Sequence, residues 1–125
     1  MEAGDDIVWR RVSRLAVAAG IGAAVLFIAV GLTTRLQMFG DGSIFSYAVA
    51  AQDAWAFHWH NISGRVFVYL YAYVPAETVV ALTGSATAGI TIYGLLFFAA
   101  PLLGLSLTFL ADRSKDRTLF TYACL

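Results

Sequence analysis

The stretch LAVAAGIGAAVLFIAVGL, residues 15–32, is 18 residues long and contains no charged side chain. At about 1.5 Å per residue a helix of this length spans roughly 27 Å, close to the ~30 Å hydrocarbon core of a bilayer. A signal peptide has a shorter apolar core, about 7–15 residues, and a small-x-small cleavage site after it. Thr33-Thr34-Arg35 follows instead. We therefore predict an uncleaved transmembrane helix.

Small residues recur along one side of this predicted helix. Ala16, Gly20 and Ala24 are four residues apart and so share one helix face. In lipid, where apolar burial no longer drives association, such a face lets helix backbones approach closely. This small-residue stripe predicts contacts with other membrane subunits, although Ala and Gly are also simply common in membrane helices.

The composition agrees with a membrane protein. Of the 125 residues, 60% are hydrophobic and 13% charged, and the mean hydropathy is +0.75, whereas soluble domains carry about a quarter charged residues. Eight basic residues balance eight acidic ones, which argues against nucleic-acid binding. No phosphate loop, HExxH, Gly-x-Ser-x-Gly or Cys-x-x-Cys motif occurs, and the single Cys124 cannot form an internal disulfide. We predict no cofactor and no metal.

Residues 66–110 contain one charged side chain, Glu77, and small and polar residues at 83–87 divide them into two parts. The second part, 88–110, is 23 uncharged residues, enough to span with tilt, and Pro101 is expected to kink it. The first part, 66–82, holds three tyrosines, a proline and Glu77, which favour an interfacial, re-entrant or cavity-lining position. We predict a crossing at 88–110, while a third crossing at 66–82 stays open.

Basic residues flank the two predicted crossings: Arg10, Arg11 and Arg14 precede the first, and Arg113, Lys115 and Arg117 follow the second. By the positive-inside rule both flanks are cytoplasmic, so the number of crossings is even. The chain is then a multi-pass protein of an inner or plasma membrane, with residues 1–14 cytoplasmic and residues 33–87 forming one non-cytoplasmic loop. With a third crossing, the basic residues after 88–110 would lie on the non-cytoplasmic side, against the rule, and the negative charges of Asp112 and Asp116 would have to offset them.

The last predicted segment, residues 111–125, combines the basic turn with the start of another apolar stretch. That stretch, TLFTYACL at 118–125, stops after eight residues, too few to cross a bilayer. Either a further helix has been cut off or the tail folds back on the membrane surface. The sequence reads as truncated.

Two local structures are expected within the mixed residues 33–65. Residues 40–43, Gly-Asp-Gly-Ser, indicate a turn, with Asp41 or Ser43 capping the next helix. From Ile44 the pattern is amphipathic over about 14 residues, which suits a helix lying in the membrane interface. Its apolar positions are Ile44, Ala48, Ala51 and Trp55, and its polar positions are Ser46, Gln52 and Asp53. Trp55, Phe57 and Trp59 suit the headgroup level.

Four side chains are candidates for chemistry. Asp41 can act as a general base, with helix capping as the competing role. His58 and His60 can point to the same side of an extended segment, although two histidines beside belt tryptophans do not make a metal site. Glu77 is an ionisable group in an apolar stretch, which is a functional hypothesis if that stretch spans the membrane.

The layout resembles the N-terminal part of C-type glycosyltransferases, polytopic enzymes that use polyprenyl-phosphate-linked sugars. Those proteins begin with a cytoplasmic N-terminus and one transmembrane helix, followed by a long non-cytoplasmic loop with an early acidic residue and juxtamembrane helices. A return helix then ends in a short basic turn. The matching pieces here are Thr33-Thr34-Arg35, Phe39-Gly40-Asp41-Gly42-Ser43-Ile44-Phe45-Ser46-Tyr47-Ala48, Ser63-Gly64-Arg65, Val74-Pro75-Ala76 and Asp112-Arg113-Ser114-Lys115-Asp116-Arg117.

This resemblance implies an all-α polytopic fold and an N-terminal fragment of a larger enzyme. Asp41 matches the first-loop acid that acts as general base toward the acceptor in the family. The resemblance also implies that Arg65, Glu77, His58 and His60 line a cavity near the donor phosphate, with membrane lipids and a polyprenyl-phosphate-linked sugar as partners.

Two other classes of function compete with this interpretation. The first is a small non-enzymatic membrane subunit that packs against a larger complex through the small-residue stripe. The second is a piece of a transporter, which would need an ionisable residue within a true crossing, and only Glu77 qualifies.

Overall fold

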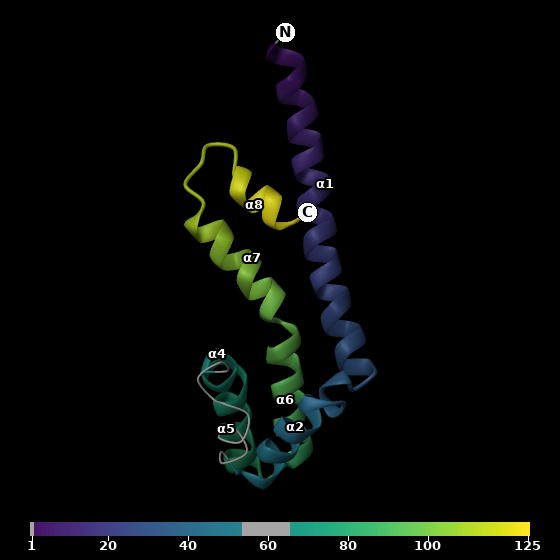
Figure 1. Cartoon of the computed structure of the whole chain (residues 1–125), viewed down its shortest axis with the longest axis vertical. Coiled ribbons are helices and arrows are strands. Elements are labelled where there is room, and N and C mark those ends of the chain that lie inside the picture. The colour runs from purple at the N-terminus through teal and green to yellow at the C-terminus, as the bar shows by residue number, and fades with distance from the viewer. Residues whose placement is uncertain (1, 54–65) are drawn as a thin grey trace. The chain divides into compact units, whose positions relative to one another are not determined.

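The computed structural model describes residues 2–53 and 66–125, and within them every regular element is a helix (Figure 1). The all-α class predicted from the sequence is thus confirmed for that part of the chain. The elements are α1 (Glu2–Thr33), a 3-10 turn η1 (Leu36–Met38), α2 (Asp41–Ala51), α4 (Val66–Val68), a π-helical turn η3 (Tyr69–Tyr73), α5 (Val74–Thr83), α6 (Ala86–Phe98), α7 (Ala100–Ala111) and α8 (Thr118–Ala123).

Within residues 2–53 and 66–125, two helical stretches are long and apolar enough to cross a membrane. They are Ile7–Thr33 within α1 and Val66–Thr83, which runs from α4 through α5. Only 17% and 22% of their apolar windows are buried within the chain, so most of their side chains face outward, as in helices that contact lipid. Helices α6 and α7 meet the same criterion only together, as a broken span or a re-entrant pair.

The predicted helix at 88–110 is interrupted. Helix α6 ends at Phe98 and α7 begins at Ala100, because Pro101 has no N–H to donate to the carbonyl four residues earlier. Proline is well tolerated in the first turn of a helix, where that N–H has no intrahelical partner, and Pro101 occupies such a position in α7. The disturbance expected at Pro101 is confirmed, and it takes the form of a break between α6 and α7.

A second proline also shapes the backbone. Pro75 stands at the start of α5, and the π-helical turn precedes it, with the N–H of Val74 bonded to the carbonyl of Tyr69. A widened turn of this kind accommodates a backbone carbonyl that receives no hydrogen bond, because proline lacks the N–H that would donate to it. The segment 66–83 thus continues as one apolar helical stretch across its proline.

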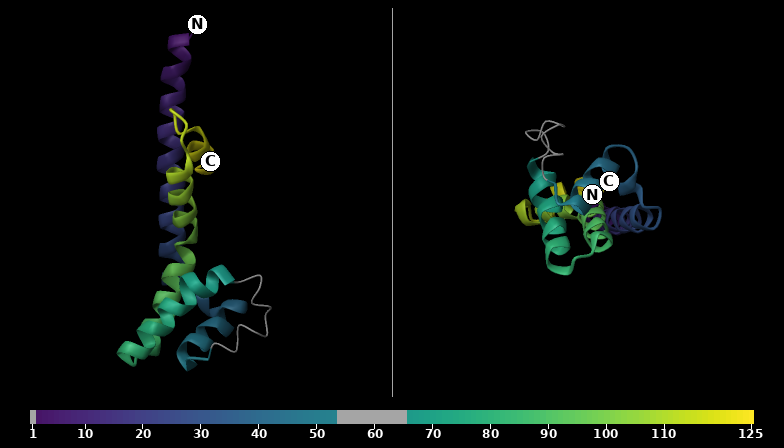
Figure 2. Two further views of the ribbon diagram at one scale, coloured as in Figure 1. Left: turned by 90° about the vertical axis from the view of Figure 1, so that its left-hand side faces the viewer. Right: turned by 90° about the horizontal axis from the view of Figure 1, so that it is seen from below.

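The chain divides into two compact units, Met1–Phe27 with Ala99–Leu125, and Ile28–Phe98. In the first unit α8 lies beside α1, as Figure 1 and the left view of Figure 2 show. Ser13 Oγ and Thr121 Oγ1 are hydrogen bonded at 2.7 Å, and the rings of Trp9 and Tyr122 are 6.1 Å apart. The tail therefore folds back onto α1, a contact that the sequence did not predict.

The small-residue stripe is used inside the first unit. Ala16 and Ala24 are buried, and a Cβ built on Gly20 would lie 2.7 Å from the carbonyl oxygen of Cys124. Gly20 therefore permits close approach of the chain's own C-terminal segment. A contact of the stripe with another subunit is untested.

The core of the second unit forms where α2, α5 and α6 meet. Its buried members are Phe45, Ala48, Val49, Ala72, Tyr73, Ala76, Val80 and Tyr93. The hydroxyl of Tyr73 donates to the carbonyl of Ala48 at 3.3 Å, which satisfies a polar group that burial would otherwise leave unpaired.

The predicted faces of α2 are wrong in part. Ser46 was expected on the polar side and is fully buried, because its hydroxyl donates to the carbonyl oxygen of Gln37 at 2.9 Å. Ile44 and Ala51, on the predicted apolar side, are exposed, which an interfacial helix allows because its apolar side faces lipid. The helix is also shorter than expected, since Gln52 adopts a left-handed conformation with φ 52° and ends it. Trp55, Phe57 and Trp59 lie outside the described residues.

Candidate functional site

A cavity of about 420 Å³ lies in the second unit, beside the start of α2. The connection from α1 to α2, the start of α2, α4 and α6 all contribute to its wall. Its lining residues are Leu36, Gln37, Phe39, Asp41, Gly42, Phe45, Val68, Tyr93 and Phe97. Most of this wall is apolar, with a carboxylate, an amide and a phenol as its polar groups, a composition typical of small-molecule sites.

The aromatic part of the wall is built from α2 and α6. Phe45 and Tyr93 have ring centroids 6.5 Å apart with tilted planes, and Tyr93 stacks with Phe97 at 6.0 Å. Tyr93 and Phe45 belong to the buried core of this unit, whereas Phe97 is exposed. The core therefore fixes one side of the cavity, because tightly packed aromatic rings cannot turn freely.

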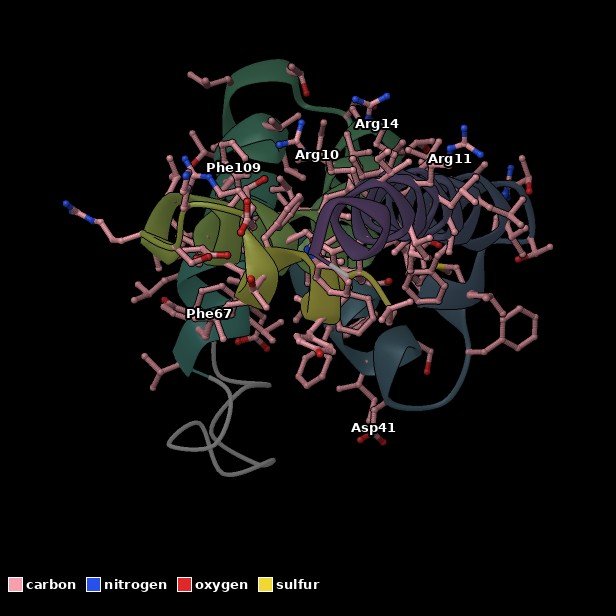
Figure 3. The ribbon with its side chains drawn as sticks, turned by 90° about the horizontal axis from the view of Figure 1, so that it is seen from above. Arg10, Arg11, Arg14, Asp41, Phe67 and Phe109 are labelled. Atoms are coloured by element: carbon pink, nitrogen blue, oxygen red, sulfur yellow. The ribbon has the colours of Figure 1, made fainter. Side chains whose placement is uncertain are left out.

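Asp41 is the first residue of α2 and is exposed. The predicted capping role is wrong, because Gly40 occupies the N-cap with φ 56°, and the Ser43 hydroxyl donates back to the carbonyl of Gly40 at 2.7 Å. Figure 3 shows the Asp41 carboxylate pointing away from the α2 ribbon, toward the outside. Asp41 thus places an accessible negative charge at the mouth of the cavity, at the end of α2 where the helix dipole favours it.

Gln37 is fixed in place by its backbone and by its side chain. Its carbonyl oxygen accepts the Ser46 hydroxyl, and a Cβ built on Gly42 would lie 2.6 Å from the same oxygen. On α6 a Cβ built on Gly94 would lie 2.8 Å from Gln37 Cδ. Two glycines therefore provide the space that this glutamine occupies between α2 and α6.

The side-chain amide of Gln37 is incompletely paired. The residue is 6% exposed, and its Oε1 is buried without a hydrogen-bond partner among the described residues. Burying such a group without a partner costs about 1–3 kcal/mol.

The other predicted site residues do not join this cavity. Glu77 lies in the first turn of α5, is half-buried and is absent from the cavity wall. His58, His60 and Arg65 lie outside the described residues. Across residues 2–53 and 66–125 no three His, Cys, Asp or Glu side chains converge as metal ligands.

Sequence reasoning missed Gln37, Tyr93 and Phe97. Gln37 is a single uncharged polar residue in a turn and matches no motif, and the two aromatics read as ordinary members of an apolar helix. The signals present in the sequence were Gly42 and Gly94. Each lets Gln37 approach closely, which can be recognised only when the two contacting segments are known.

Comparison with known proteins adds no relative. No family model, no curated protein and no solved structure gives a significant match to this chain.

Proposed function

We propose that this chain is a multi-pass membrane module for glycosyl transfer from a polyprenyl-phosphate-linked sugar, with Asp41 as the general base. The observation that carries the proposal is the position of Asp41, an exposed carboxylate at the mouth of an aromatic-lined cavity. Candidate membrane spans on the same chain supply the lipid environment that a polyprenyl donor needs.

The chemistry assigned to Asp41 is proton removal from the acceptor. An acceptor hydroxyl oxygen attacks the anomeric carbon of the sugar, and a new C–O bond forms there. The bond from that carbon to the phosphate oxygen breaks, and polyprenyl phosphate leaves with the electron pair. The Asp41 carboxylate takes the hydroxyl proton, which raises the nucleophilicity of the attacking oxygen.

The membrane orientation is part of the proposal and rests on the first unit. Pairing of α8 with Trp9 and Ser13 brings the basic turn at 113–117 to the same end of this unit as Arg10, Arg11 and Arg14. Figure 3 shows these three arginines extending outward from α1. Two basic flanks at one end support an even number of crossings with both ends cytoplasmic.

The test is transfer of a radiolabelled sugar from its polyprenyl-phosphate donor, measured in membranes that contain the protein. The Asp41→Asn variant keeps the size of the side chain and removes the base, so we expect a loss of 10²-fold or more, the typical contribution of general-base catalysis (~10²–10⁴). Asp116→Asn, at the exposed α7–α8 turn, is the matched control and should transfer at the wild-type rate. Unchanged transfer in Asp41→Asn would refute the role of Asp41 and favour the non-enzymatic subunit.

A substitution at Gly20 does not separate these two functions. Gly20→Leu would disturb the chain's own packing, because the added side chain would collide with Cys124 of the same chain. Ala18→Leu changes an exposed position of α1 and leaves that internal contact intact. Loss of complex formation in Ala18→Leu would support a subunit that associates through the face of α1 opposite the small-residue stripe.

A further inference from the structure

A small polar pocket lies in the first unit, where α1 meets the turn between α7 and α8. Its volume is about 160 Å³, well under that of the cavity beside α2. Its wall consists of aromatic, hydroxyl and charged side chains, namely Trp9, Arg10, Ser13, Arg14 and Asp116. The hydroxyl of Ser13 is already hydrogen bonded to Thr121 of α8, so the charged groups are the part of the wall that is available to a ligand.

The two arginines of this pocket present their positive charges together. Arg10 and Arg14 are four residues apart on α1 and so lie on one face of the helix. Both are exposed, and Figure 3 shows both side chains extending outward from α1. Among the described side chains no carboxylate forms an ion pair with either guanidinium group, that of Asp116 in the same wall included. The pocket therefore has two available positive charges against one negative charge.

The pocket lies at the depth of lipid headgroups when α1 crosses a bilayer. Arg14 directly precedes the uncharged stretch 15–32, and Arg10 is one helical turn, about 6 Å, farther out. A headgroup layer is about 5–8 Å thick on each side of the hydrocarbon core. Trp9 adds an amphipathic ring of the kind enriched at this level. The acidic residues of this end of α1 precede Arg10 and are farther still from the apolar stretch: Glu2, Asp5 and Asp6.

We propose that this pocket binds the headgroup of an anionic phospholipid, whose phosphodiester oxygens accept hydrogen bonds from Arg10 and Arg14. Guanidinium groups suit this ligand because their N–H groups match the geometry of a phosphate and stay charged at any physiological pH. The single negative charge of such a lipid balances a wall with two guanidinium groups and one carboxylate. A zwitterionic lipid has no net charge and leaves one positive charge unbalanced. The proposal depends on the insertion of α1 in a bilayer, and not on sugar transfer.

The probe is phosphatidylglycerol with brominated acyl chains, which quenches the fluorescence of a nearby tryptophan. The full chain carries Trp55→Phe and Trp59→Phe, so Trp9 at the pocket is the only reporter. Nanodiscs of phosphatidylcholine contain one tenth brominated phosphatidylglycerol, phosphatidylcholine or phosphatidylethanolamine. Binding of phosphatidylglycerol should be about fivefold tighter than that of either zwitterionic lipid, the factor that ~1 kcal/mol for one balanced charge provides.

Two double variants separate the pocket from the general charge of this end of the unit. Arg10→Gln with Arg14→Gln removes both guanidinium groups from the wall, so the preference for phosphatidylglycerol should disappear. Arg11→Gln with Arg113→Gln is the matched control, because it removes the same charge from exposed residues outside the pocket wall. This control should retain the wild-type preference. If the pocket variant does not fold, Arg14→Gln alone decides the question, and an unchanged preference in it would overturn the proposal.

Four other results would overturn the proposal. They are no preference in the wild type, equal binding of phosphatidylethanolamine, a retained preference in the pocket variant, and an equal loss in the control, which would mean general surface charge. Added inorganic phosphate should leave the quenching unchanged, and its reversal by millimolar phosphate would assign the pocket to free phosphate instead. Sugar transfer is not part of this measurement. Failure here therefore leaves the role of Asp41 standing, and an inactive role for Asp41 leaves the lipid site standing.

Discussion

Asp112 Oδ2 accepts a hydrogen bond from the backbone N–H of Phe120 at 2.9 Å, eight residues further along the chain. The other carboxylate oxygen accepts from the N–H of Ser114 at 2.9 Å and from its hydroxyl at 2.6 Å. Arg117 donates to the carbonyl oxygens of Phe109 and Asp112. A carboxylate that is 2% exposed thus connects the end of α7 to the start of α8 and satisfies an N–H group in the first turn of α8.

Replacement of Asp112 by Ala should release α8 from α1. The change removes all three hydrogen bonds that the carboxylate accepts and leaves the N–H of Phe120 unpaired. Burial raises the pKa of the Cys124 thiol, so the docked thiol reacts slowly with alkylating reagents. We expect faster alkylation of Cys124 in Asp112→Ala. The control Asp116→Ala should react at the wild-type rate, and equal rates in both variants would contradict the role of Asp112.

The docking of α8 should depend on pH through the same carboxyl group. Hydrogen bonds from the Ser114 hydroxyl and the N–H of Phe120 hold the pKa of Asp112 below its usual value. A pKa that is lower in the folded protein means that the stabilisation is complete above the unfolded value, about 3.9, and is lost as the pH falls through the folded value. Trp9 fluorescence in a background without the other tryptophans should report undocking in acid. Asp112→Asn should lack this acid transition.

Gly20→Ala should destabilise the first unit even though alanine favours helix. The added Cβ would approach the Cys124 backbone to 2.7 Å, and such overpacking costs about 1–3 kcal/mol against a helix-propensity gain of at most ~1 kcal/mol. Gly22→Ala, two residues away with nothing within 4 Å of the new Cβ, should be as stable as the wild type or more so. Thermal unfolding in one detergent compares the two, and equal midpoints would refute the contact.

Ser46→Ala should destabilise the second unit. The substitution leaves the buried carbonyl of Gln37 without the hydroxyl donor at 2.9 Å, at a cost of about 1–3 kcal/mol. Ser43→Ala is the matched control, because the hydroxyl of Ser43 bonds to an exposed carbonyl of Gly40 and water can replace it. Denaturant unfolding should separate the two variants. If both variants lose the same small amount of unfolding free energy, the hydrogen bond of Ser46 stabilises the unit no more than that of Ser43 does.

The apolar runs predicted the helices well because helix length and composition are local properties. The stretch at 15–32 lies within α1, and the small polar residues at 83–87 mark the boundary where Gly84, with φ 68°, ends α5. Pro101 was recognised as a disturbance from its missing N–H. The structure has a break between α6 and α7 there, and the residue at which the next helix begins was not predictable from proline alone.

The candidate site was predicted only at Asp41. A charged residue in a Gly-rich turn can be recognised in the sequence. The position of Gln37 depends on its contacts with Ser46 and with Gly94, a residue far along the chain. The polar face assigned to α2 failed for the same reason. Ser46 looks like a surface residue until its hydroxyl finds a carbonyl acceptor inside the core.

By itself the sequence determined the helical class, the apolar stretch at 15–32 and the basic flanks, whereas it predicted a crossing at 88–110 and left 66–82 open, and the structure has a candidate span at Val66–Thr83 and a broken pair at 86–111. These features follow from the hydrophobicity of the residues and from the requirement that a backbone in lipid forms its hydrogen bonds within one helix. Neither depends on a second segment of the chain. Only the tertiary structure decided that Gly20 receives Cys124, that Asp112 pairs with Phe120 and that Gln37 lies in a cavity wall. Each of these depends on two distant segments meeting, and packing, which is not a local property, selects which segments meet.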